Sequence, residues 1–210
     1  MLLEERRGSV TIWKGGISDE SSWVPSKSSK ADLMDLVRAG LLPSKEMICW
    51  RTVGADLDPS VWLSETALFV PFVRRGLALP ACNFLLGLLY YYGIELHNFD
   101  PEAILHISIF VYFCEAFLGI PLHFILFCYL FCIFPHPDHK NTRIFREARL
   151  RLRPERVNEY IPYPALGSTN GWETEWFYLG NPYPPLPRIK NKAPEYVLEW
   201  ICPGPEADDG

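Results

Sequence analysis

The sequence predicts a mainly α protein, namely a compact helical bundle followed by a small β-rich C-terminal extension. Three observations lead to this fold class. Residues 69–134 contain most of the strongly apolar material, and prolines and glycines divide this block into short segments. Four apolar segments joined by short turns describe a helical bundle. The residues after the block include a stretch that alternates between leucine and arginine, which is the period of a β-strand.

The composition is that of a protein with a hydrophobic core. Hydrophobic residues make up 49% of the 210 residues, which excludes a wholly disordered chain. The net charge of −5 argues against a generally basic surface that would coat nucleic acid. Most of the six cysteines lie inside apolar runs, as reduced core thiols do. The first residues lack the apolar stretch of a signal peptide, so we expect an intracellular protein, nuclear or cytoplasmic.

Changes in composition along the chain predict four parts. Residues 1–28 form a flexible N-terminal segment rich in glycine and serine, and residues 29–137 form the helical domain. Residues 138–202 form a basic, β-rich and proline-rich extension, because arginines and prolines concentrate there. Residues 203–210 are expected to be a disordered acidic tail.

The first helix is predicted directly after Ser29. Leu33, Leu36 and Val37 recur at helical spacing. Ser29 can cap the first turn, and Gly40 suits the position just after the last turn. A short amphipathic helix therefore lies between these two residues.

Prolines, glycines and one aspartate set the bounds of the segments in the apolar block. Asp100 gives the clearest start signal, because it can cap a helix whose first position is Pro101. Glu102 then meets the positive end of that helix. Pro80 is expected in the first turn of the preceding helix. The four segments are expected at residues 62–75, 80–92, 101–118 and 121–134.

Two β-strands are predicted in the C-terminal part. Arginine alternates with leucine over residues 149–153, which is a strand pattern. A second strand is predicted within residues 172–179, after a turn at Gly171. A proline-rich connector follows at residues 182–187.

The basic residues of this part are candidates for contact with nucleic acid, because arginine side chains bind phosphate. The same pattern also describes a sheet with one solvated face above a buried face formed by Leu150 and Leu152, which is the interpretation we favour. The candidates for nucleic-acid contact are Arg143, Arg146, Arg149, Arg151 and Arg153.

One group of residues has the chemistry of a zinc site. Cys128, Cys132, His136 and His139 supply two thiols and two imidazoles, and Zn²⁺ accepts such a set in tetrahedral geometry. The spacing of the two cysteines would place them on one helix face. However, the spacing of the whole set is not that of a zinc finger or knuckle. We therefore favour core cysteines with surface histidines, and we predict no metal and no cofactor.

No catalytic site is predicted, and we expect a protein that is not an enzyme. Nucleases that use two metal ions need carboxylates that converge on those ions. Asp100, Glu102 and Glu115 instead lie at helix starts or inside the apolar block, without a strand scaffold to bring them together.

Three ionisable residues of the apolar block have two interpretations each. Glu115 is either a buried acid with a raised pKa or a carboxylate satisfied by Arg74, Arg75 or a helix end. We favour the second. His106 and His123 are expected to be hydrogen-bonded core residues rather than metal ligands.

The last apolar segment also has the composition of a membrane span. Residues 116–134 contain no charged side chain, and their length is close to the roughly 20 residues that a spanning helix needs. Arginines follow within the next twenty or so residues, which would place the C-terminal side in the cytosol. A buried core helix explains the same segment, and we favour it.

Several segments resemble one family of sequences. Residues 72–80 read FVRRGLALP, residues 92–96 read YGIEL, and residues 114–124 read CEAFLGIPLHF. In this order they are similar to the motifs of the plant "putative gypsy-type transposon" domain. Residues 171–178 resemble a further element of such proteins, and the resemblance covers roughly residues 30–180. It departs from the family at residues 124–130, which lack the usual tryptophan and basic residue.

The resemblance implies an open reading frame derived from a plant retroelement, with no established catalytic activity and no active-site residues to transfer. We therefore expect a non-enzymatic protein that interacts with element-encoded proteins or with nucleic acid, and we infer no small-molecule substrate. The alternative is a single-span membrane protein that uses residues 116–134 as its transmembrane helix.

Overall fold

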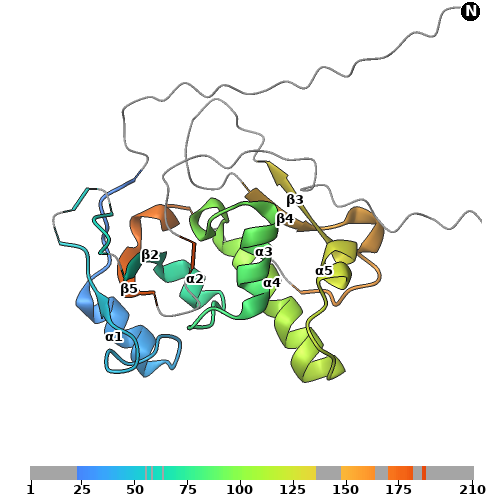
Figure 1. Cartoon of the computed structure of the whole chain (residues 1–210), viewed down its shortest axis with the longest axis horizontal. Helices are drawn as coiled ribbons and strands as arrows, with labels where there is room; N and C mark the ends of the chain where they lie inside the picture. Colours follow the sequence, from blue (N-terminus) through green and yellow to red (C-terminus); the bar gives the residue numbers. More distant parts are fainter. Residues whose placement is uncertain are drawn as a thin grey trace, which may run out of the picture.

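In a computed structural model of the chain, the described residues are 23–54, 56–57, 59–62, 64–135, 148–163, 170–181 and 186–187 (Figure 1). The acidic tail and most of the flexible N-terminal segment that the sequence predicts lie outside these residues. The described part contains five α-helices and two antiparallel sheets. The fold is therefore mixed α and β, and the prediction of a mainly helical bundle with a small β-rich extension is wrong.

The first sheet joins the two ends of the described chain. Strand β5 (Trp176–Gly180) lies in the middle, between β1 (Trp50–Arg51) and β2 (Glu65–Phe69). All five residues of β2 pair with β5. The segment at residues 62–75 is therefore a strand followed by the short helix α2 (Val70–Arg74), because an apolar run of this length fits a buried strand as well as a helix.

The second sheet replaces the end of the fourth predicted helix, which also begins at Phe124 rather than at Pro121. Helix α5 (Phe124–Leu130) ends after seven residues, and β3 (Phe131–Pro135) continues from it. Strand β3 pairs along its whole length with β4 (Ala148–Leu152), which is the strand that the arginine–leucine alternation predicts. Phenylalanine and isoleucine in β3 favour a strand once a partner is available.

The first helix is confirmed. Helix α1 (Lys30–Arg38) begins after Ser29, whose hydroxyl accepts a hydrogen bond from the backbone N–H of Asp32 at 3.3 Å. The Asp32 carboxylate accepts the backbone N–H of Ser29 at 2.8 Å, which completes a capping box. Gly40 follows the helix with φ of 71°, a left-handed conformation that glycine adopts without strain.

The central helices agree with their predicted ends except at Pro80. Helix α3 (Asn83–Tyr92) begins three residues beyond Pro80, and Gly93 closes it. A short 3₁₀ turn (Leu96–Asn98) leads into α4 (Pro101–Tyr112). Asp100 caps α4, because its carboxylate accepts the backbone N–H of Ala103 at 2.8 Å. The helix continues as a π-helical turn, η2 (Phe113–Leu118).

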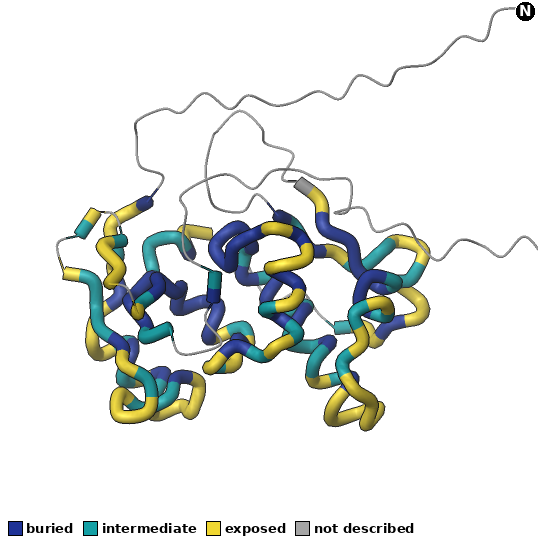
Figure 2. The backbone as a smooth tube through the Cα atoms, in the orientation of Figure 1, coloured by how far each residue is buried: buried dark blue, intermediate teal, exposed yellow. Residues whose placement is uncertain are grey.

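Aromatic side chains fill the core, whose buried backbone lies in the interior of Figure 2. One aromatic group lies on the three-stranded sheet, where Phe69 contacts the rings of Trp23, Phe72 and Trp172. A second group joins α3, α4 and α5 to β3, and it comprises Phe84, Phe110, Phe127 and Phe131. Short 3₁₀ turns at Pro154–Arg156 and Trp172–Thr174 complete the described elements.

Candidate interaction surface

An exposed apolar tip lies where the chain turns from α4 to α5. Four apolar side chains form it, and we call these four residues the apolar tip. Phe117 is 74% exposed, Ile125 71%, Leu118 44% and Ile120 38%. The turn projects from the body at the lower right of Figure 1, and Figure 2 shows it as a continuous exposed stretch. Single exposed apolar residues are common on protein surfaces, but a group of this kind marks interaction sites.

The π-helical turn and a glycine fix the shape of the apolar tip. The Ile120 N–H donates to the Cys114 carbonyl at 2.9 Å, and Cys114 itself is fully buried. Gly119 has φ of 64°, so the chain reverses there in a conformation that other residues adopt only with strain. Phe117 stacks on Phe113, with ring centroids 5.6 Å apart. The tip is therefore attached to the core through its first turn.

The apolar tip carries no charged side chain. Residues 116–125 contain no aspartate, glutamate, lysine or arginine. Glu115 lies at the edge and is exposed, so its interpretation as a buried acid is wrong. Arg74, one of the partners expected for Glu115, instead pairs with Glu175 at 3.0 Å. His123 is also exposed, which corrects its expected place in the core.

The structure does not form one helix over residues 116–134. That segment contains the end of η2, the turn after it, the short helix α5 and most of β3. A transmembrane helix at these residues is therefore wrong for this fold. Within the described residues, one helix is long and apolar enough to cross a membrane, namely Pro101–Leu118, and 33% of it is buried in the protein.

The basic residues predicted to contact nucleic acid are only partly described. Arg143 and Arg146 lie outside the described residues. In β4, Leu150 is buried and Arg151 is exposed, as expected for one solvated face, but Arg149 and Leu152 are both half-buried. Arg153 is engaged inside the protein. Its guanidinium Nε donates to the Cys128 carbonyl at 2.9 Å, and its side chain is 12% exposed.

The predicted zinc ligands are also only partly described. His136 and His139 lie outside the described residues. Cys128 and Cys132 do not share a helix face, because α5 ends between them. The Cys128 thiol lies 3.3 Å from the Tyr92 hydroxyl, and Cys132 donates to the Arg151 carbonyl at 3.7 Å. Both cysteines are core residues, and the described part of the chain holds no group of three metal-ligating side chains.

Two histidines are held neutral by burial. His106 packs against Phe131 and is hydrogen-bonded to Tyr163, as predicted, but it is half-buried rather than fully inside the core. Burial lowers the pKa of His106 to about 4. His97 is 3% exposed, and burial likewise lowers its pKa to about 4. The His97 Nε2 lies 3.4 Å from the Glu95 carboxyl, but this contact is not an ion pair near pH 7 because the imidazole is neutral there.

A polar network that sequence reasoning missed fastens the loop before β2 onto the first sheet. The Arg51 guanidinium donates to both carboxylate oxygens of Glu65, at 3.0 and 2.8 Å, and this contact lowers the pKa of Glu65. The Arg51 guanidinium carbon also lies 3.7 Å from the ring centroid of Tyr178 and 4.8 Å from that of Trp62. The Tyr178 hydroxyl donates to Asp56 at 2.8 Å. No local motif links these residues, and the pairing of both β1 and β2 with the central strand β5 brings them together.

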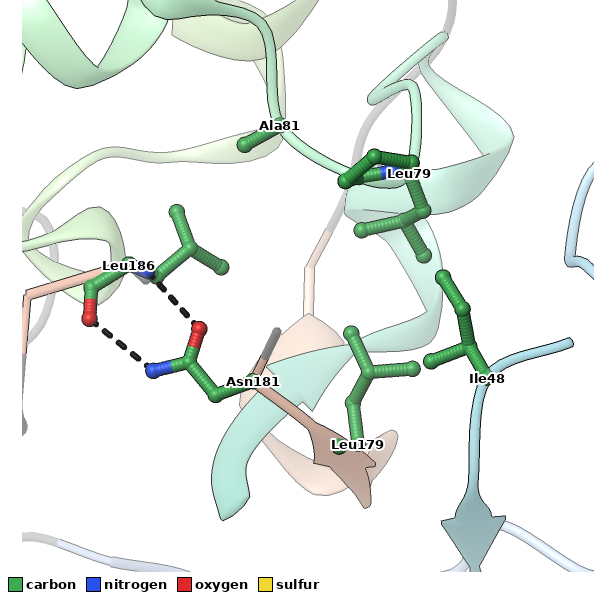
Figure 3. Close-up of a pocket in the computed structure, with 8 residues that line it drawn as sticks. Ile48, Leu79, Ala81, Leu179, Asn181 and Leu186 are labelled. Atoms are coloured by element: carbon green, nitrogen blue, oxygen red, sulfur yellow. Dashed lines mark hydrogen bonds between the residues drawn. The ribbon is translucent and has the colours of Figure 1, made fainter. Parts of the chain in front are cut away.

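A small pocket lies at the edge of the first sheet, between Ile48, Leu79 and Leu179 (Figure 3). The Asn181 side chain closes one end by donating to the Leu186 carbonyl at 3.0 Å and accepting its N–H at 2.7 Å. The cavity volume is about 10 Å³, which is at most the space of one water molecule. This pocket is therefore too small for an organic ligand.

The motifs that carry the family resemblance have structural roles. Phe72 is fully buried, and Gly76 has φ of 93° with no room for a side chain, because an added Cβ would lie 3.0 Å from Ser108. Glu95 is buried and caps the 3₁₀ turn before α4. Gly119 forms the turn of the apolar tip. The residues of these motifs therefore shape the fold of this chain.

Residues 67–135 match the family described as "Putative gypsy type transposon". The resemblance inferred from the motifs is therefore confirmed for this stretch, which we call the gypsy-type segment. The match does not show that the protein comes from a plant. No curated protein and no solved structure matched the chain.

The gypsy-type segment contains the whole apolar tip but not the whole fold. Strand β2 begins just before the segment, and its partner β5 lies far beyond it. Strand β3 ends the segment, and its partner β4 also lies outside. Sequence reasoning assigned the residues of the tip to a core helix or a membrane span. The turn signals Gly119 and Pro121 were the evidence for an exposed reversal instead.

Proposed function

We propose that this protein is a non-enzymatic component of a plant gypsy-type retroelement and that it acts by binding an element-encoded protein through the apolar tip. The family match supports the link to the transposon. The plant origin rests on the similarity of the sequence motifs to the plant family. The binding role rests on one observation, which is the exposed, uncharged group formed by Phe117, Leu118, Ile120 and Ile125.

Burial of these side chains in an interface would be favourable, because apolar surface contributes roughly 25 cal/mol per Å² removed from water. Exposed aromatic residues are also the usual centres of protein interfaces. The rest of the turn holds the tip in a fixed shape, so little conformational entropy is lost when it binds.

Contact with nucleic acid is a second candidate function, and the exposed side chain of Arg151 on β4 favours it. A phosphate backbone is bound by several cations together. Because Arg153 is held by the Cys128 carbonyl, the described residues support this candidate less than they support protein binding.

Photo-cross-linking tests the protein-binding proposal. A photoreactive benzoylphenylalanine replaces Phe117 in the full chain, which is produced together with the element-encoded proteins. A matched variant carries the same group at Met47, which is 78% exposed and lies between α1 and β1. We expect protein adducts from position 117 that are absent from position 47. Equal adducts from both positions, or none from position 117, would refute the proposal.

A further inference from the structure

The charge, the exposed area and the shape of the apolar tip indicate which partner it binds. We propose that the tip binds a second copy of this chain, so that two tips pack against each other across a two-fold axis. This inference rests on the proposed function, because it takes the tip to be a protein-binding surface.

The charge of the tip suits contact between identical surfaces. A two-fold interface brings each residue close to its own copy, so charged residues near the axis oppose like charges. Residues 116–125 carry no charge, and the nearest carboxylate, Glu115, lies at the edge. The same composition disfavours an anionic membrane, since such surfaces attract lysine and arginine side chains.

The area of the tip suits a weak dimer. An aromatic side chain contributes about 150–250 Å², and Phe117 is 74% exposed. Together with the three aliphatic side chains of the tip and the neighbouring exposed residues Ala116 and Pro121, this surface presents roughly 500 Å². Two copies would bury about 1,000 Å² together, which is the lower limit for a specific interface. We therefore expect a weak and reversible dimer.

Within the described residues, the pocket at the edge of the first sheet does not compete with a second tip as a binding site. The tip projects from the body (Figure 2). The pocket between Ile48, Leu79 and Leu179 holds about 10 Å³. That pocket cannot accept a phenylalanine side chain.

Sedimentation velocity of the purified full chain over a concentration series tests the inference. The tip variant carries Phe117→Ser and Ile125→Ser. The matched control carries Met47→Ser and Leu57→Ser, at positions that are 78% and 66% exposed and lie between α1 and β2. We expect reversible dimers of the wild-type chain, an association at least about tenfold weaker in the tip variant, and no change in the control.

Each other outcome contradicts the second copy as the partner. A monomer at all concentrations, or a dimer that the tip variant leaves intact, would overturn the inference. Flotation with neutral phosphatidylcholine vesicles that depends on the tip would assign it to lipid instead. Cross-links from position 117 to another protein, with a monomeric chain, would keep the proposed function and refute self-association. The absence of both cross-links and dimers would refute both proposals.

Discussion

Phe69 of β2 lies directly opposite Trp176 of β5 in the antiparallel sheet. Phe69 belongs to the gypsy-type segment, and Trp176 lies far beyond its end. The same relation holds in the second sheet, where Phe131 inside the segment pairs with Leu152 outside it. Both sheets therefore join the gypsy-type segment to later parts of the chain. The segment contributes β2 to the first sheet and β3 to the second, and the partner of each strand lies beyond residue 135.

The first prediction is that residues 67–135 alone do not fold. Without β4 and β5, strands β2 and β3 lose their backbone partners, and buried Phe69 and Phe131 lose cover. Unpaired strand edges and exposed apolar surface favour aggregation. We expect the fragment to lack dispersed amide signals in NMR spectra, whereas a fragment of residues 23–187 shows them. A folded 67–135 fragment would show that the sheets are dispensable.

The second prediction compares two glycines of the gypsy-type segment. Gly76 has φ of 93°, and an added Cβ would lie 3.0 Å from Ser108, so Gly76→Ala should lower the free energy of unfolding by roughly 1–3 kcal/mol. Gly87 lies on the exposed side of α3 with open space around it. Gly87→Ala should raise the free energy of unfolding by about 0.5–1 kcal/mol. Urea denaturation measures both, and a neutral Gly76→Ala would contradict the close contact with Ser108.

Local signals predicted the helix ends well, because the residues that decide them are neighbours in the chain. Ser29 caps α1, Asp100 caps α4, and Gly93 and Gly119 end their helices. The strand β4 was also predictable, since alternation is a local pattern.

The sheets and the site were harder to predict because they depend on distant partners. The run from Phe131 to Phe134 is continuously apolar, so it suits a buried helix or a buried strand, and its pairing with β4 decides. The Arg51 network likewise forms only after β1 and β5 pair. The apolar tip was missed because Phe117 and Leu118 have the composition of a core, whereas the three-dimensional structure places both at an exposed turn.

The third prediction separates structural arginines from surface arginines. Arg153→Ala should lower the free energy of unfolding by about 1–3 kcal/mol, because it removes a donor from the Cys128 carbonyl near the end of α5. Arg151→Ala, at an exposed position of β4, should change stability by no more than about 0.5 kcal/mol. Thermal unfolding of both variants measures the difference.

Filter binding at low salt then tests the binding of nucleic acid with the Arg151→Ala variant, which we expect to fold as the wild type does. A loss of nucleic-acid binding in this variant would support the contact predicted for the arginines. Arg153→Ala is unsuitable for that assay, because weaker binding could follow from lost stability. Wild-type protein that does not bind nucleic acid at low salt would remove the second candidate function.

The fourth prediction concerns pH. The pKa of His97 and of His106 is about 4 in the folded protein, against about 6.5 in an unfolded chain. Between these values the unfolded state binds more protons than the folded state, so the free energy of unfolding falls as the pH decreases from about 6.5 to about 4. Above about pH 6.5 both histidines are neutral in the folded and the unfolded state, so their contribution to the free energy of unfolding is fully present. The loss should amount to a few kcal/mol when both histidines contribute.

A histidine variant shows which residue causes this pH dependence of stability. His106→Phe keeps an aromatic ring beside Phe131 and removes one titrating group, so the slope of stability against pH should decrease between pH 4 and 6.5. An unchanged slope in His106→Phe would show that His106 can be protonated without unfolding, which requires water to reach its ring in the folded protein. The burial of His106 between α4 and β3 would then be looser than its contacts with Phe131 and Tyr163 indicate.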